Sequence, residues 1–149
     1  MSLQKQVMDQ MKAAMKAKDK VALEALRAIK SAILLAQTEN GSNEELSEEV
    51  EVSLVQKLVK QRKDSATIFT EQDRADLAEP ELAQIAVIEQ FLPEQLTAEE
   101  IEKVVLQTIE VTGAAGMKDM RRVMELVSKE LAGQADGKTV SSIVKSKLS

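Results

Sequence analysis

Apolar residues recur every three or four positions along most of this 149-residue chain, as at Leu3, Val7 and Met11 and again at Leu26, Ile29 and Ile33. This is the period of one face of an α-helix, whereas a half-buried strand alternates every second residue. Strong helix formers dominate the chain, and only five Gly and two Pro residues interrupt it. The pattern predicts an all-α protein.

Capping residues predict where the first helices begin. Ser2 and Asp19 stand directly before the first two apolar stripes, in the position that helix N-caps prefer. Residues 40–43 are expected to form a turn, with Ser42 and Glu45 at the spacing of a capping box. A long helix is then expected over residues 48–70.

The two prolines indicate how the chain is divided. Pro80 limits where the next helix begins, because proline is tolerated in a first turn, and Pro93 ends that helix. Thr97 opens a capping box after this break, and three short helices follow. We therefore expect an N-terminal helical domain over residues 1–93 and a small three-helix domain over residues 94–149. The helix between the prolines should bury a stripe made of Leu82, Ile85, Ile88 and Leu92.

Few side chains are suited to catalysis. The chain has no His, Cys, Trp or Tyr, and general acid–base or nucleophilic catalysis usually uses His, Cys or a Ser beside a base. Neighbouring carboxylates such as Glu99 and Glu100 project about 100° apart on a helix and do not converge. The segment from Gly113 to Gly116 lacks the strand and the Lys-Ser/Thr ending of a phosphate-binding loop. We expect no catalytic residue, no metal site and no cofactor.

The N-terminal residues carry a charge every few positions and have no apolar core of a secretory signal. No apolar run approaches the roughly 18 residues that span a bilayer. Without Cys there is no disulfide framework. We expect a cytoplasmic protein with no membrane partner.

Residues 113–149 carry seven basic and four acidic residues, a net charge of +3 in a protein of net charge −5. Lys, Arg and helix N-termini are the groups that contact nucleic-acid phosphates, and the turn at residues 135–138 offers both. Only Phe69 and Phe91 are aromatic, so stacking on unpaired bases is not expected. An alternative for each basic residue is an exposed, solubilising role. The candidate RNA-binding residues are Lys118, Arg121, Arg122, Lys138 and Lys145.

Five short blocks occur in an order that resembles the YqeY-like (GatB/YqeY) family. That family usually reads KQRxDS, GRxDL, YLPxQL, DMGKVM and GRADG. Here the corresponding blocks are Lys60–Ser65, Arg74–Leu77, Phe91–Leu96, Asp119–Met124 and Gly133–Gly137. Each block alone is a weak signal, but the ordered series covers essentially the whole chain.

The resemblance implies a helical N-terminal domain followed by a small three-helix domain. It also implies kinship with the C-terminal tail of GatB, a subunit of glutamyl/aspartyl-tRNA amidotransferase, in which the tail helps hold tRNA and catalysis resides elsewhere. The chain departs from the family pattern at three positions. Arg121 and Asp73 replace glycines, and Gln134 replaces an arginine.

We therefore predict a non-catalytic protein that binds tRNA or another structured RNA. Lys60, Arg62, Lys63 and Arg74 either extend the RNA-binding surface or serve the structure, with Arg74 pairing to a carboxylate at a helix junction. One alternative function is a protein-interaction module that docks an amidotransferase or another translation factor. A further alternative is an accessory subunit in glutamine-dependent carbon–nitrogen ligation, that is, tRNA amidation.

Overall fold

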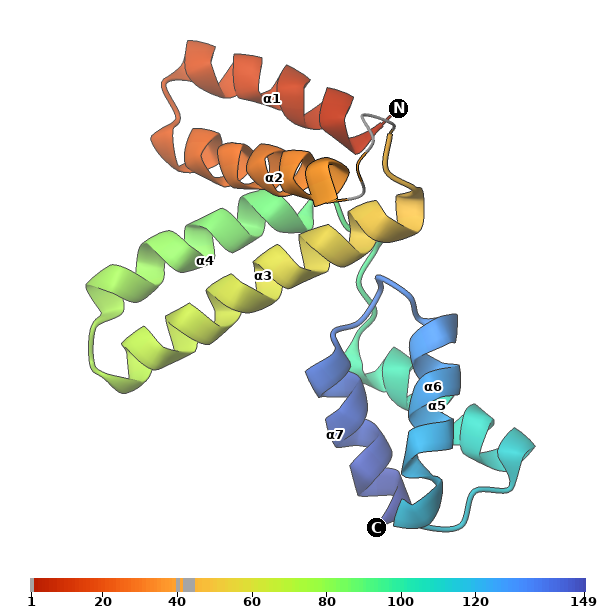
Figure 1. Cartoon of the computed structure of the whole chain (residues 1–149). Coiled ribbons are helices and arrows are strands. Elements are labelled where there is room, and N and C mark those ends of the chain that lie inside the picture. The colour runs from red at the N-terminus through yellow and green to blue at the C-terminus, as the bar shows by residue number, and fades with distance from the viewer. Residues whose placement is uncertain (1, 40, 42–44) are drawn as a thin grey trace. The chain divides into compact units, whose positions relative to one another are not determined.

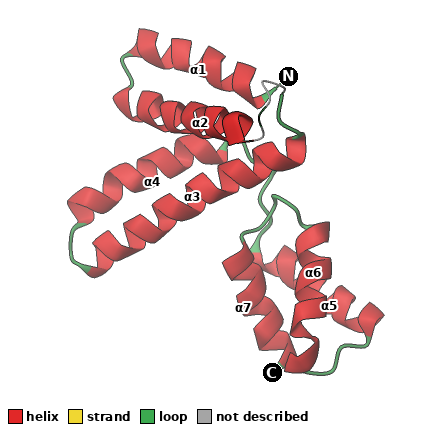
Figure 2. Cartoon of the chain, viewed as in Figure 1, coloured by secondary structure: helices red, strands yellow, loops and turns green. Residues whose placement is uncertain are grey.

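The computed structural model of the protein describes residues 2–39, 41 and 45–149, and these residues form α-helices and one 3-10 helix with no strand (Figures 1 and 2). The all-α prediction is confirmed. The helices are α1 (Leu3–Ala17), α2 (Lys20–Glu39), α3 (Glu48–Glu71), α4 (Ala75–Glu89), α5 (Ala98–Thr112), η1 (Met117–Asp119), α6 (Met120–Glu130) and α7 (Gly137–Leu148).

Contacts between residues divide the chain into two compact units, Met1–Leu92 and Pro93–Ser149. In the N-terminal unit, α1 packs against α2, while α4 packs against both α2 and α3 (Figure 1). Leu26, Ile29 and Ile88 are the largest fully buried side chains of its core. The core therefore forms where α2 and α4 meet, with α1 and α3 completing it.

Three side-chain caps begin the first three helices. The Ser2 hydroxyl accepts a hydrogen bond from the Lys5 amide, and the Asp19 carboxylate accepts one from the Ala22 amide at 3.1 Å. Both residues are the caps predicted from the sequence. Helix α3 is capped by Ser47, whose hydroxyl accepts a hydrogen bond from the Val50 amide. The turn expected at residues 40–43, and Ser42 with it, lies outside the described residues apart from Gly41.

Helix α4 differs from the prediction in its start and in its buried face. It begins at Ala75, so Pro80 lies inside the helix rather than in its first turn. Proline has no N–H, so the helix forgoes the bond from position 80 to the carbonyl of Asp76. Ile85 and Ile88 are buried as predicted, but Leu82, also expected in the core, is 56% exposed, because the buried stripe continues through Ala78.

The C-terminal unit is built from α5, α6 and α7 around one core of aliphatic side chains. Thr97 caps α5 by accepting a hydrogen bond from the Glu100 amide, and Gly113 ends this helix in the left-handed conformation, at φ 68°. The start at Thr97 agrees with the sequence prediction. Its buried core consists of Ile101, Val105, Val123, Val127, Leu131, Val140, Val144 and Leu148.

None of the helices in the described parts of the chain is long and apolar enough to cross a membrane.

Candidate nucleic-acid interface

All five predicted RNA-binding residues are exposed on the C-terminal unit. They do not lie on one helix. Lys118 belongs to η1, Arg121 and Arg122 to the first turn of α6, and Lys138 and Lys145 to α7. The helical spacing of these residues sorts them into two rows.

The α7 row is formed by Lys138 and Lys145, which are seven residues apart. Two turns separate them, so both project from the same side of α7, about 10 Å apart along the axis. This side lies off the stripe of Val140 and Val144, which are buried. Two cations at this spacing can contact two phosphates of one strand.

The α6 row begins at Lys118 and continues through Arg122, four residues further on. Lys129 extends it, because it follows Arg122 by seven residues and is exposed. The i, i+7 spacing would have revealed Lys129 in the sequence. Arg121 stands beside this row, 93% exposed, with its Nε 3.5 Å from a carboxylate oxygen of Glu125.

The two rows do not form one flat positive face. The buried stripes of α6 and α7 face the same core, so the solvent sides of these helices point away from that core in different directions. An RNA that contacts both rows has to follow the curvature of the unit. The third cation of α7 is already engaged, since Lys147 Nζ lies 2.6 Å from the Glu102 carboxylate of α5.

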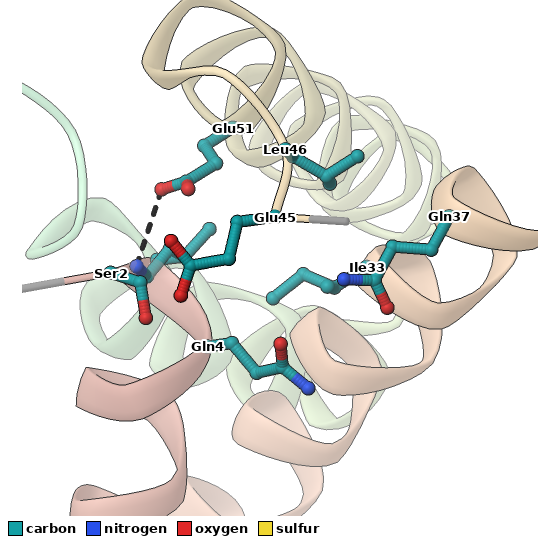
Figure 3. A pocket seen from close by; sticks show the side chains of 8 residues that line it. Ser2, Gln4, Ile33, Gln37, Glu45, Leu46 and Glu51 are labelled. Atoms are coloured by element: carbon teal, nitrogen blue, oxygen red, sulfur yellow. Dashed lines mark hydrogen bonds between the residues drawn. The ribbon is translucent and has the colours of Figure 1, made fainter. Parts of the chain in front are cut away.

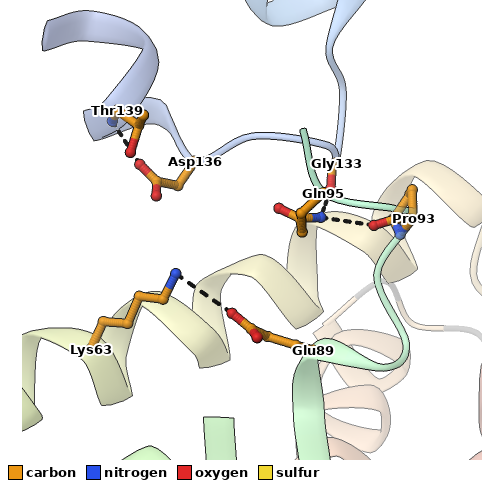
Figure 4. A network of polar contacts seen from close by, with 7 residues as sticks. All are labelled: Lys63, Glu89, Pro93, Gln95, Gly133, Asp136 and Thr139. Atoms are coloured by element: carbon orange, nitrogen blue, oxygen red, sulfur yellow. Dashed lines mark hydrogen bonds and ion pairs between the residues drawn. The ribbon is translucent and has the colours of Figure 1, made fainter. Parts of the chain in front are cut away.

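The turn before α7 is closed by the chain's own groups. Asp136 is the N-cap of α7, and its carboxylate accepts a hydrogen bond from the Thr139 amide at 2.7 Å (Figure 4). The Thr139 amide is therefore satisfied within the chain, while the contact of residues 135–138 with a phosphate stays a prediction. A phosphate approaching here also meets the negative charge of Asp136.

Two of the family-pattern blocks contact each other at this turn. Gln95 Nε2 donates to the backbone carbonyls of Pro93, at 2.8 Å, and Gly133, at 2.7 Å (Figure 4). The Leu96 amide donates to the carbonyl of Gln134 at 2.9 Å. We call these bonds from Gln95 and Leu96 to Gly133 and Gln134 the clasp. It fixes the segment that enters the unit to the loop between α6 and α7.

The block from Asp119 to Met124 is also largely structural. The Asp119 carboxylate accepts a hydrogen bond from the Ala115 amide at 3.0 Å, which orders the loop before η1. Val123 is fully buried, and Met120 and Met124 pack against the same core. Only Arg121 and Arg122 of this block remain available to a ligand.

In the N-terminal unit, three basic residues of the first two blocks have partners within the unit. Arg62 donates to the Gln84 side chain at 2.9 Å, a bond that joins α3 to α4, and to the Leu58 carbonyl within α3. Lys63 lies 3.6 Å from the Glu89 carboxylate (Figure 4). Arg74 forms a two-bond pair with Asp76, with both distances 3.0 Å. These contacts support the structural reading of Arg62, Lys63 and Arg74, while their part in an RNA-binding surface stays a prediction.

A denser basic cluster lies at the α1–α2 turn, which the sequence reading passed over. Within residues 12–20 there are four lysines and one acid, and all four lysines are exposed. The acid, Asp19, is occupied as the α2 cap. Counting net charge in a nine-residue window would have revealed this lysine cluster in the sequence. These lysines are Lys12, Lys16, Lys18 and Lys20.

Two carboxylates with shifted pKa values also have structural partners. Burial raises the pKa of Glu51, whose carboxylate accepts a hydrogen bond from the Leu3 amide at 3.2 Å, at the start of α1 (Figure 3). Arg74 lowers the pKa of Asp76 through their hydrogen bonds. Within the residues that the structure describes, no group of three or more acidic side chains is arranged to hold a metal ion.

These features define an all-α protein of two helical units, with rows of basic residues on the second unit. The chain belongs to the family of Yqey-like proteins, whose family model matches residues 4–148. The resemblance drawn from the ordered blocks is therefore confirmed. No curated protein matches the chain.

The three departures from the family pattern have different structural consequences. Asp73 adopts φ 61°, in the left-handed region that favours glycine, so a glycine here suits the backbone of the α3–α4 turn. Arg121 is almost fully exposed, so nothing in the unit packs closely on it. Gln134 contributes its backbone carbonyl to the clasp, a role that does not depend on its side chain.

Proposed function

We propose that this protein binds structured RNA, with tRNA as the expected class, through the basic residues of its C-terminal unit, and that it acts in the cytoplasm without catalysing a reaction by itself. The kinship of the family with the tRNA-holding tail of GatB supports the choice of tRNA. The proposed contacts are Lys118, Arg121, Arg122, Lys138 and Lys145.

The observation that carries this proposal is the freedom of four of these side chains. Lys118, Arg122, Lys138 and Lys145 are exposed, and within residues 2–39, 41 and 45–149 no carboxylate lies within ion-pair distance of them. By contrast, Lys147 is paired to Glu102. Unpaired cations in rows at helical spacing are suited to a phosphate backbone.

The charge of the whole unit limits the affinity. Residues 93–149 hold eight basic and nine acidic residues, so long-range attraction of RNA is weak. Binding therefore depends on the local rows and should fall with salt, by a slope of about 0.7–0.9 per phosphate contacted. Base identity should matter little.

The test measures tRNA binding by fluorescence anisotropy at low salt, with the double variant Lys138→Glu and Lys145→Glu. We expect all tRNAs to lose affinity alike, roughly tenfold or more, and the salt slope to fall by about 1.4 to 1.8. Helicity should be unchanged, because both residues are exposed.

The matched control is Lys12→Glu with Lys20→Glu at the α1–α2 turn, which changes the charge equally on two exposed residues. We expect it to lower affinity less than threefold. If it lowers affinity as much as the α7 pair does, the assignment to the C-terminal unit is wrong. If no tRNA binds at micromolar concentration, the proposed RNA-binding function is wrong.

Asp136→Asn tests the same surface with a change that should raise tRNA affinity instead of lowering it. Asparagine preserves the N-cap of α7 and removes the negative charge two residues before Lys138. We expect tRNA affinity to rise about two- to threefold with stability nearly unchanged. Unchanged affinity would mean that phosphates do not approach this end of α7.

A further inference from the structure

A groove of about 580 Å³ lies between α2 and α3 in the N-terminal unit. Its floor is made of Ala32 and Ala36 from α2 and Leu54 and Leu58 from α3, all half-buried. Leu54 and Leu58 also pack against the core of the unit. The floor of the groove is thus continuous with the hydrophobic core.

The packing of α4 explains why the groove stays open. Helix α4 contacts both α2 and α3 extensively, whereas α2 and α3 contact each other over a shorter stretch. The described part of the chain supplies no element to fill the space between them on this side. As a result Leu35 is 61% exposed and Val50 is 41% exposed at the walls of the groove.

The charges at the walls are mostly acidic. Glu39, the last residue of α2, and Glu49, in the first turn of α3, line the groove together with one base, Lys57. Between Glu39 and Glu51 the sequence has no basic residue. Such a wall repels a phosphate backbone and attracts cations. This surface therefore differs in its chemistry from the basic rows proposed to hold RNA.

We propose that this groove docks an amphipathic helix of a partner protein, one whose apolar face is flanked by Lys or Arg. An apolar floor between two helices accepts the apolar face of a third helix, and charge complementarity with Glu39 and Glu49 selects basic flanks. Leu35 and Val50 become buried in the complex. The proposal goes beyond RNA binding and does not depend on it.

The experiment titrates the full chain with three fluorescent 18-residue peptides. One places Leu along a helical stripe and Lys elsewhere, the second replaces Lys by Glu, and the third scrambles the Leu/Lys order. We expect the ordered Leu/Lys peptide to bind at least tenfold more tightly than either other peptide. In NMR spectra, the largest shifts should fall on Ala32, Ala36, Leu54 and Leu58.

The matched variants are Leu35→Lys in the groove and Leu82→Lys on α4, where a leucine of similar exposure lies outside the groove. Both changes add one positive charge. Losing the burial of one leucine and adding a cation should weaken the peptide roughly tenfold at position 35 and less than twofold at position 82.

Three results would overturn the proposal. The first is equal binding of the ordered and scrambled peptides, and the second is an equal effect of the two lysine variants. The third is self-association of the chain, detected by sedimentation, that protects Leu35 in the absence of peptide, since the occupant would then be a second copy. None of these results bears on tRNA binding, which is measured separately with the α7 variants.

Discussion

The two units close their turns by different means. In the N-terminal unit, the turns after α1 and α3 contain Lys18 and Asp73, non-glycine residues at φ 58° and 61°, besides Gly41 at φ 68°. In the C-terminal unit the left-handed positions are glycines, Gly113 at φ 68° and Gly133 at φ 79°. Side chains and backbone then add the clasp, the Asp119 bond and the Asp136 cap. The second unit thus avoids backbone strain that the first unit tolerates.

The two units should lose stability separately. Leu26→Ala empties a fully buried site in the N-terminal core and should cost that unit about 3 kcal/mol. Hydrogen exchange should accelerate in α1 to α4 and remain unchanged in α5 to α7. A fragment of residues 94–149 should also fold alone, although domains near this size are marginal. Equal acceleration in both units would show a single cooperative body.

Gly113→Ala tests the conformational role of glycine in the second unit. The added methyl group meets no atom within 4 Å, so the only penalty is the left-handed backbone. We expect a loss of about 1–1.5 kcal/mol in chemical denaturation. Gly116→Ala is the control, because its φ of 174° is extended and its added methyl group is also unobstructed. A similar loss in both variants would contradict the explanation by φ.

Gln95→Ala removes the side-chain part of the clasp. The carbonyl of Gly133 then loses its Gln95 donor, and the C-terminal unit should lose about 1 kcal/mol. Amide exchange should rise most in the loop between α6 and α7. Gln107→Ala, at an exposed position of α5, serves as the control and should change stability little. An unchanged loop would mean that the Leu96 bond suffices.

Asp73→Gly should stabilise the N-terminal unit, which is the reverse of the Gly113 result. Glycine relieves the left-handed backbone at φ 61°, and this gain outweighs the added freedom of the unfolded chain. The net gain should be only about 0.5 kcal/mol, because aspartate tolerates this region better than most residues do. Thermal unfolding of residues 1–92 measures the gain. Destabilisation would indicate that the Asp73 side chain has a stabilising contact of its own.

Glu51→Gln should give the smallest effect, visible mainly as a change in pH dependence. Burial raises the pKa of Glu51 above its ordinary value of about 4.5, so the folded state favours the protonated form. The stabilisation of the folded state that is linked to this raised pKa is present when the pH is below the ordinary pKa, and it is lost as the pH rises through the raised pKa. The glutamine variant should lose less stability than wild type over this window, as measured by urea denaturation. Parallel curves for wild type and Glu51→Gln would contradict the burial effect.

The helices were predictable because caps and periodicity are local. Ser2, Asp19, Thr97 and Gly113 act within a few residues of their own helix ends, so the sequence displays their roles directly. The prediction that Leu82 is buried was wrong because helical spacing does not tell which side of α4 faces its neighbours. The start of α4 failed because proline inside a helix is disfavoured rather than forbidden.

The site was less predictable for a similar reason. The carboxylate partners of Lys63 and Lys147 lie on other helices, and no local pattern reveals which cations are already paired. The clasp joins residues 38 positions apart. The family-pattern blocks marked important residues, but the structure assigns most of them to caps, turns and core. The unpaired cations Lys118 and Arg122 and the two lysines of α7 carry the RNA proposal, and their contacts with RNA stay a prediction.

The clasp also bears on how such a unit is inherited. Because Gln95 and Leu96 are bonded to Gly133 and Gln134, the first segment of the C-terminal unit is anchored within the unit itself. Its geometry does not need an upstream partner to define where it starts. We therefore expect a gene segment encoding this unit to be portable: joined behind unrelated coding sequence, its product should still fold around its own beginning.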